Sequence, residues 1–517
     1  MDKYNLPVCS AVFSDRAELP KTFEAALPDY CPGIMRIVKT DALFSETNAS
    51  LESPYVVLRG KANVRVLYIA EGQGFLKSVS FPFDFEHTFD AAKMPEICAE
   101  AVIEAQAGAL AVSAKPKGTR SMEIKLGLAL NVNVYDCAQL PLLSPDSAAD
   151  AELHAGFATA AVHIKLSAAP ERLHEDITLE GGMAAIADIA DSSAMLLLQE
   201  LRAEDGALKF SGNAVFKCTY RAESAGDSSA AEYVYLTKEI PFEGEIADER
   251  LKRGMTVTGR ILPADIETGS SFDPYGESRV IHVSIGYRMQ CDAFDESEVG
   301  YFDDGYCAAY ECDFEKNTYA YERLGGTVKD NAHMEERLHT DRSNLVEITD
   351  TSMALGAVSA EVSDGKLYAN GKAGVWVLGS DEKGEPTCLQ TVLALHLPIE
   401  SVHDAASDRH YLINTQISSC SATLRDGEIL LTADAATEGV MLEKCRLNAI
   451  DRADIHYDSP KPLCQAEYIV YYPERGETVW SIAKKYEIPQ KKLREANNLT
   501  GADTTGDRRT IVIPCGQ

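Results

Sequence analysis

Hydrophobic and polar residues alternate with a period of two along much of this chain. Val64, Val66 and Tyr68 occupy every second position of one such stretch, and Leu126 and Leu128 begin another. Successive side chains of a strand point to opposite faces of a sheet, so this pattern predicts half-buried β-strands. Residues 93–110 have apolar residues at wider spacings, and we expect a helix there.

A short motif recurs and divides this β-rich part of the chain into three. Residues 205–214 and 364–373 each contain an Asp-Gly pair followed by a glycine inside a strand, and residues 60–62 keep only the Gly-Lys-Ala part. Asp-Gly supplies the positive φ angles of a tight hairpin turn. The later glycine indicates a bulge or a close backbone approach. No G-x-x-x-x-G-K-[ST] motif occurs, so hairpin geometry is favoured over phosphate binding.

The repeats predict a mainly β protein. Many short strands between turn signals are typical of β-sandwiches, and we expect three tandem β-sandwich-like units followed by a small α+β domain of βααβ order. The predicted boundaries are residues 1–165, 166–330 and 331–449 for the units, 450–466 for a proline-containing linker and 467–517 for the terminal domain. The terminal domain has a net charge of about +1, so the rest of the chain carries about −32 and accounts for the total of −31.

This charge limits the partners of the protein. A strongly acidic chain repels nucleic-acid backbones and anionic membrane surfaces, and it fits a basic protein surface instead. The amino terminus has no basic segment followed by an apolar run, and no stretch reaches about 18 apolar residues, so we expect neither a signal peptide nor membrane insertion. The thirteen cysteines form no C-x-x-C pair. They predict free thiols and a cytoplasmic location.

No catalytic constellation stands out. The sequence has no G-x-S-x-G and no H-E-x-x-H motif, and we expect no enzyme activity, no metal and no cofactor. His403 and His410 are seven residues apart, which on a helix would leave them about 10 Å apart and too far for one ion. A solvated loop is favoured for them, and an exposed face is favoured for Asp303-Asp304 over a glycosidase pair. A cysteine–histidine hydrolase remains open, but no local signature selects its residues.

The last 50 residues have a distinctive order of elements. A strand at 468–472 precedes a helix that begins after Thr478, which is a suitable N-cap, and Val479, Ile482 and Ala483 lie on one face of that helix. Pro489 suits the first turn of a second helix with Leu493 and Ala496 inward, and residues 510–514 form the closing strand.

This terminal segment resembles a LysM domain. The resemblance rests on residues 476–483 and 493–499, and it implies binding of glycans that contain N-acetylglucosamine, such as peptidoglycan or chitin, in a groove between two loops. The residues that match the two loops are Gly476, Glu477, Thr478 and Val479, and Asn497, Asn498, Leu499 and Thr500. Thr478 could serve only as a helix cap, and a core position is favoured for Trp480 over a sugar-stacking platform. The Asp507-Arg508-Arg509 segment departs from the usual pattern.

The repeats resemble the SPOCS (spore coat structural) domain of endospore-forming bacteria. The matching segments are residues 28–38, the Gly-Lys-Ala strand with Tyr68, Phe81-Pro82-Phe83, and residues 292–294 with 303–307. The resemblance implies a mother-cell protein that attaches the coat to the forespore by binding the basement-layer ATPase, stage IV sporulation protein A. In that family the LysM module is thought to contact the protein partner rather than peptidoglycan.

Three hypotheses follow. The first is a non-enzymatic scaffold of the spore envelope that binds coat proteins through its LysM and SPOCS domains and self-associates through open sheet edges. The second is a cell-wall protein that binds peptidoglycan. The third, least favoured because no motif supports it, is a cell-wall hydrolase.

Overall fold

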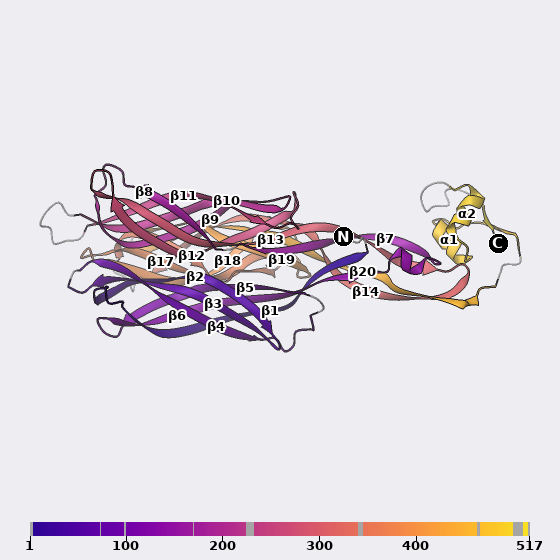
Figure 1. Ribbon diagram of the computed structural model, residues 1–517, viewed down its shortest axis with the longest axis horizontal. Helices are drawn as coiled ribbons and strands as arrows, with labels where there is room; N and C mark the ends of the chain where they lie inside the picture. The colour runs from indigo at the N-terminus through magenta and orange to yellow at the C-terminus, as the bar shows by residue number, and fades with distance from the viewer. Residues whose placement is uncertain are drawn as a thin grey trace.

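The computed structural model confirms a mainly β protein that ends in a small α/β unit (Figure 1). It describes residues 4–72, 74–97, 100–168, 170–223, 232–339, 345–425, 427–462, 466–499 and 510–514. The β-strands form an elongated body, and the two helices lie at one end of it.

Three units of six or seven strands make up the body, and each consists of two antiparallel sheets. In unit 1 the sheets have the orders β1-β6-β5 and β2-β3-β4, with strands β1 (Asn5–Ala26), β2 (Ile34–Glu52), β3 (Tyr55–Ala70), β4 (Leu76–Asp90), β5 (Glu100–Pro116) and β6 (Ser121–Pro141). A 3₁₀ turn, η1 (Pro145–Ala148), leads to unit 2.

Unit 2 repeats this topology, with its first strand divided into two. Its sheets are β12-β13-β7, with β8 also paired to β13, and β11-β10-β9. The strands are β7 (Glu152–Ser167), β8 (Glu171–Thr178), β9 (Ile186–Glu204), β10 (Ala207–Ala222), β11 (Tyr233–Ala247), β12 (Thr256–Phe272) and β13 (Ser278–Tyr306).

Unit 3 has the same topology, with its second strand divided instead. Its sheets are β14-β20-β19 and β15-β17-β16, with β18 paired to β17. The strands are β14 (Tyr310–His339), β15 (Leu345–Leu355), β16 (Ser359–Ser363), β17 (Lys366–Asp381), β18 (Pro386–Ile399), β19 (Arg409–Arg425) and β20 (Glu428–Pro460). The three repeated units are therefore built on one design.

The predicted unit boundaries cut through strands. Positions 165, 330 and 449 fall inside β7, β14 and β20, and the predicted linker at 450–466 is wrong for residues 450–460, which continue β20. The repeated motif lies on the central strand of one sheet in each unit, so it shows that a unit exists without showing where the unit begins. The long first and last strands carry no internal turn signal that would have located the boundaries.

The helix predicted at 93–110 is also wrong. Strand β5 begins at Glu100 and pairs with β6 along its length, and Ala105, Ala109 and Val112 are buried against the unit 1 core. The alanine-rich composition suits a helix, but the strand pairing and the apolar face that β6 offers decide the conformation.

The recurring glycines occupy the positions that the motif predicts. Gly60, Gly212 and Gly371 lie on the central strands β3, β10 and β17. A Cβ atom at Gly212 would lie 2.1 Å from the carbonyl oxygen of Leu197, and one at Gly60 would lie 2.7 Å from the carbonyl oxygen of Glu46. The register of the neighbouring strand shifts at both places. The close backbone approach is thus confirmed, and Gly206 and Gly365 have the expected positive φ angles of 81° and 72°.

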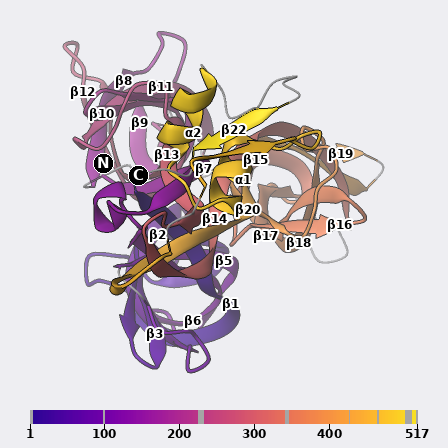
Figure 2. The same cartoon turned by 90° about the vertical axis from the view of Figure 1, so that its right-hand side faces the viewer.

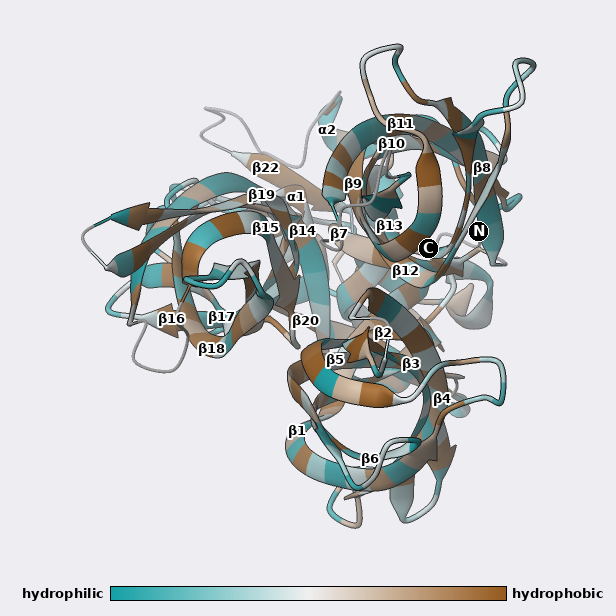
Figure 3. Cartoon of the chain, turned by 90° about the vertical axis from the view of Figure 1, so that its left-hand side faces the viewer, coloured by the Kyte–Doolittle hydropathy of each residue, from teal (hydrophilic) through white to brown (hydrophobic). Residues whose placement is uncertain are grey.

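The three units pack side by side around a common axis, as the end-on view in Figure 3 and the opposite view in Figure 2 show. The first strands of the units, β1, β7 and β14, contact one another pairwise. A shared apolar cluster takes two buried residues from each unit: Leu6 and Leu142, Ala160 and Val299, Leu447 and Ala449. Trp376 of unit 3 is buried against unit 1, and its Nε1 donates to the Thr40 carbonyl at 2.8 Å.

A buried cluster of charges joins unit 1 to unit 2. Lys39 and Arg65 of unit 1 lie 3.6 and 3.5 Å from Asp191 of unit 2, and both also pair with Asp41. The Lys39 side chain is 3% exposed and that of Asp191 is 9% exposed. Burial would raise the pKa of Asp41, but Arg65 and Lys39 outweigh it and lower that pKa to about 2. Asp41 therefore remains charged within the interface.

The expectation of free thiols is wrong for one pair of cysteines. Cys9 on β1 and Cys137 on β6 face each other and form a disulfide, with their Cα atoms 4.1 Å apart. The other described cysteines are free, and they are Cys31, Cys218, Cys291, Cys307, Cys312, Cys388, Cys420 and Cys445.

Candidate functional site

The carboxyl-terminal unit has the predicted βααβ order, with β21 (Tyr468–Tyr471), α1 (Val479–Lys485), α2 (Gln490–Asn497) and β22 (Ile511–Pro514). Strands β21 and β22 pair antiparallel. Val479, Ile482, Ala483 and Leu493 are fully buried in its core, as their spacing predicts. Ala496 is exposed, and the prediction that it points inward is wrong.

The first candidate loop, residues 476–479, shapes the start of α1. Gly476 is exposed and has a φ of 93°, which favours glycine. The Glu477 carboxylate accepts hydrogen bonds from the Tyr471 hydroxyl at 2.9 Å and from the Glu474 N–H at 2.8 Å. Thr478 caps α1 through a capping box with Ser481, because its Oγ1 accepts from the Ser481 N–H at 3.0 Å and its own N–H donates to Ser481 Oγ at 2.9 Å.

The second candidate loop follows α2. The Asn497 side chain is buried and joins α2 to β22, donating to the carbonyls of Leu493 and Val512 and accepting from the Val512 N–H at 2.7 Å. Asn498 is exposed and adopts a left-handed conformation that ends the helix. Leu499 packs partly against the core that contains Val479. Thr500, the last predicted site residue, lies outside the described residues.

The predicted site residues thus fall into two groups. Val479 and Asn497 are buried and hold the unit together, and Glu477 and Thr478 have intramolecular partners that define the first loop. Gly476 and Asn498 present exposed surface, one in each loop. One residue of each loop, Val479 and Leu499, packs into the core of the unit. The arrangement offers backbone groups and an amide to a polar ligand such as a glycan.

Side chains of the body hold this unit in place. Trp480 and Lys484 lie one turn apart on α1, and both contact Asp304 near the end of β13, at 3.4 Å through Trp480 Nε1 and at 2.5 Å through Lys484 Nζ. Tyr306, the last residue of β13, is buried in the core of the unit and donates to the Ile488 carbonyl at 2.8 Å. Figure 1 shows the helices against the ends of the long strands.

Trp480 is accordingly a core residue rather than a sugar-stacking platform. It is 8% exposed, its ring packs edge-on against Tyr306 at a centroid distance of 5.2 Å, and it lies 5.0 Å from the ring of His154. Asp303 pairs with His154 at 2.7 Å, so the acidic pair at 303–304 is part of the docking surface. The sequence alone did not reveal this surface, because its residues come from strands that lie about 180 and 330 residues before α1 in the chain.

The docking of this unit should depend on pH through Asp304. Partial burial would raise the pKa of Asp304, but hydrogen bonds from Lys484 and Lys316 outweigh it and hold the pKa below its ordinary value of 3.8. A carboxyl group with a lowered folded pKa stabilises the contact above the unfolded pKa, and this stabilisation is lost as the pH falls through the folded pKa. We therefore expect α1 to be protected from hydrogen exchange at pH 6 and to lose protection below about pH 4.

Exchange mass spectrometry of the full chain tests this expectation, with Asp304→Asn as the comparison. The variant should show weak protection of α1 at both pH values. Equal protection of α1 in the two proteins at pH 6 would contradict a docking role for Asp304.

Other candidate chemistry is sparse in the part of the chain that the structure describes. That part contains no group of three or more His, Cys, Asp or Glu residues arranged to hold a metal ion. His403 is exposed in a loop, as expected, whereas His410 lies on β19 and its Nδ1 is 3.5 Å from Glu322. Among the described residues, no helix has the length and apolar character needed to cross a bilayer.

Comparison with known families identifies one segment. Residues 474–503 match the LysM domain model, a range that covers the first loop, both helices and the described part of the second loop. No curated protein and no solved structure matched the chain. The chain therefore contains a LysM domain, and such a domain suggests binding of peptidoglycan or a chitin-type glycan.

Proposed function

We propose that this protein is a non-enzymatic scaffold of the spore envelope, located in the mother-cell cytoplasm at the forespore surface. The LysM domain is its anchoring element, and the three β units are SPOCS-type domains that hold coat proteins. The preferred partner of the LysM domain is the basement-layer ATPase, stage IV sporulation protein A. This proposal rests on the resemblance of the repeats and on the way in which the LysM domain is attached.

The observation that supports a scaffold best is the shared core between the LysM domain and the body. Tyr306 of β13 is buried among LysM side chains, and Lys461, at the end of the body, pairs with Glu487 at 2.6 Å. A binding module that only tethers an enzyme works well on a flexible linker, which lets the enzyme search its surroundings. A module packed onto the body fixes the direction of attachment, as a structural layer requires.

Binding of peptidoglycan through the LysM domain is the second candidate. The match at residues 474–503 favours it, and so do the exposed positions of Gly476 and Asn498 in the two loops. In this case the β body would present coat proteins at a glycan surface rather than at a protein layer.

A binding experiment with the full chain separates the two candidates. The wild-type protein is mixed with the purified basement-layer ATPase and, separately, with purified peptidoglycan. The variant Asn498→Gly removes an exposed side chain while glycine tolerates the φ of 49° at that position. The matched control is Asp404→Gly, which has a φ of 54° in an exposed loop of unit 3.

We expect the wild type to bind the ATPase, and Asn498→Gly to weaken binding about tenfold while the control leaves it unchanged. Sedimentation with peptidoglycan that depends on Asn498, without binding of the ATPase, would replace the first candidate by the second. Release of soluble muropeptides by the full chain would contradict a non-enzymatic role. Binding of neither partner would contradict both candidates.

A further inference from the structure

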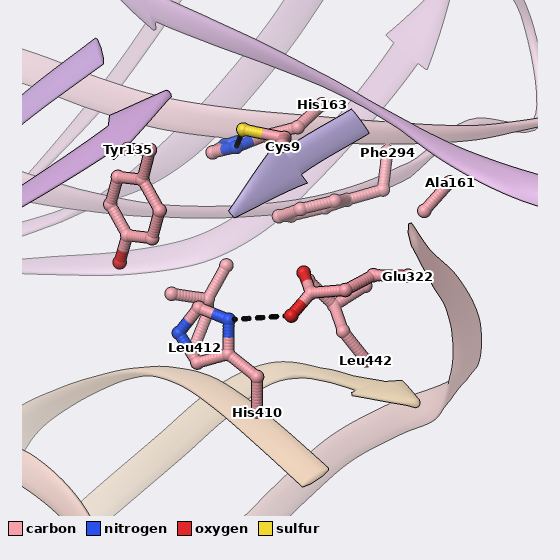
Figure 4. Close-up of a pocket in the computed structure, with 9 residues that line it drawn as sticks. All are labelled: Cys9, Tyr135, Ala161, His163, Phe294, Glu322, His410, Leu412 and Leu442. Atoms are coloured by element: carbon pink, nitrogen blue, oxygen red, sulfur yellow. Dashed lines mark hydrogen bonds and ion pairs between the residues drawn. The ribbon is translucent and has the colours of Figure 1, made fainter. Parts of the chain in front are cut away.

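The disulfide of unit 1 lies where all three units meet. Cys9 and Cys137 are directly opposite each other on β1 and β6, and both are only partly buried. A small cavity of about 10 Å³ adjoins Cys9, and residues of every unit line it: Tyr135 from unit 1, His163 and Phe294 from unit 2, and Glu322 and His410 from unit 3. Figure 4 shows the Cys9 sulfur beside the His163 ring at the edge of this cavity.

His163 is positioned to act on Cys9. Its Nδ1 lies 3.9 Å from Cys9 Sγ, and its Nε2 lies 2.7 Å from Asp292 Oδ1. The Phe294 ring stacks on the imidazole at a centroid distance of 4.6 Å, which fixes the plane of the ring. The His163 side chain is 6% exposed. A sulfur, an imidazole and a carboxylate therefore lie in series across the interface between units 1 and 2.

Asp292 determines which nitrogen of His163 is free to accept a proton. Burial would raise the pKa of Asp292, but the hydrogen bond with His163 and the charge of Lys165 outweigh it, so the pKa is lowered and the carboxylate stays ionised. An ionised carboxylate accepts a hydrogen bond from Nε2–H. In the neutral imidazole Nδ1 then carries the lone pair, and that lone pair faces the sulfur.

Three free cysteines of the described chain have a different environment. Burial raises the pKa of the Cys218 and Cys388 thiols to about 12, and that of Cys291 is also raised by burial. Thiolates rather than thiols react, so these three thiols are expected to be inert. Among the cysteines that the structure describes, Cys9 differs in having an imidazole nitrogen 3.9 Å from its sulfur.

We propose that Cys9 and Cys137 form a reversible redox site, in which His163 is the base that activates Cys9 toward small disulfides. In the reduced protein, His163 Nδ1 takes the proton of the Cys9 thiol. The Cys9 thiolate attacks one sulfur of a low-molecular-weight disulfide, forms a mixed disulfide and releases one thiolate, which receives the proton from His163. Cys137 then attacks the Cys9 sulfur and releases the second small thiol with the Cys137 proton. Two protein thiols and one small disulfide thus give the protein disulfide and two small thiols.

The position of this site gives the reaction a structural consequence. The disulfide links the two strands of unit 1 that face units 2 and 3, next to the apolar cluster on the common axis. Oxidation is expected to make the junction of the three units more resistant to opening, because the cross-link restricts the opened state.

The test uses the full chain, first reduced and then exposed to oxidised glutathione at neutral pH. Digestion without reductant, followed by mass spectrometry, measures how fast the Cys9–Cys137 cross-linked peptide forms. We expect the wild type to form it and His163→Asn to form it about tenfold more slowly, because the thiolate fraction of Cys9 falls. The control is His333→Asn, which removes another histidine paired with an aspartate at 2.7 Å, on the exposed surface of β14 and away from any cysteine pair.

A second pair of measurements separates activation from folding. In Cys137→Ser, the rate at which iodoacetamide alkylates Cys9 should fall when His163→Asn or Asp292→Asn is added, while the melting temperature of each protein is recorded. Unchanged alkylation of Cys9 in both double variants would overturn the proposal. So would the absence of the cross-linked peptide from the oxidised wild type, or its formation at the same rate in His163→Asn.

Discussion

Replacing Gly212 by alanine should destabilise unit 2 by about 3 kcal/mol, the upper end of the usual cost of forcing atoms into a packed interior. The new Cβ would lie 2.1 Å from the Leu197 carbonyl oxygen and 2.7 Å from the Phe242 ring. The carbonyl belongs to the backbone of β9, which cannot move without breaking its pairing with β10. Hydrogen exchange of β9 and β10, together with thermal unfolding of the full chain, measures the effect.

Gly269→Ala is the matched control for this substitution. Gly269 lies in β12 of the same unit, and no atom is within 4 Å of the position that its Cβ would occupy. We expect a change within about 1 kcal/mol, since alanine loses less conformational entropy on folding than glycine does. Equal effects at Gly212 and Gly269 would show that the carbonyl contact does not constrain the central strand.

Replacing Asp191 by asparagine should cost about 3 kcal/mol and loosen unit 2 from unit 1, because it leaves buried cations without sufficient compensation. Asp41 would then be the ion-pair partner left to Lys39 and Arg65, and the Lys39 side chain is 3% exposed. Thermal unfolding and the exchange rates of β2 and β9 report the loss. Adding Lys39→Met to the variant should recover much of the stability, since it removes the unpaired charge.

A second ion pair between the same two units provides the control. Asp188 of unit 2 pairs with Lys77 of unit 1, and both side chains are 31% exposed. Asp188→Asn should change stability by less than about 1 kcal/mol, because solvent screens such a pair. If Asp191→Asn has no greater effect than Asp188→Asn, the buried cluster does not hold the units together.

The sequence predicts the individual elements more completely than their arrangement. The alternation at Val64, Val66 and Tyr68 predicts a strand, and all three side chains are fully buried in β3. The Asp-Gly pairs and the strand glycines depend on local backbone geometry, so a single sequence is enough to locate them. The conformation of residues 100–116 could not be predicted in this way, because their alanine-rich composition is compatible with a helix. They form a strand because they pair with β6.

The candidate site shows the same division. The two loops could be located from the sequence, because the capping box at Thr478 and the left-handed residue at Asn498 are local features. The sequence could not show which of the two asparagines is buried. Asn497 is buried against β22, whereas Asn498 is exposed. Ala496 and Asn497 are one helical step apart, and the position of β22 decides which of them faces the core.

The sequence by itself determined that this chain has three repeated β units and a LysM domain, because both depend on patterns within short segments. Only the tertiary structure decided that the units share one axis, that Trp480 packs against Tyr306 and that Cys9 meets His163. These contacts join residues separated by about 150 positions or more in the chain. Their partners are selected by the packing of whole sheets, and no local periodicity encodes that choice.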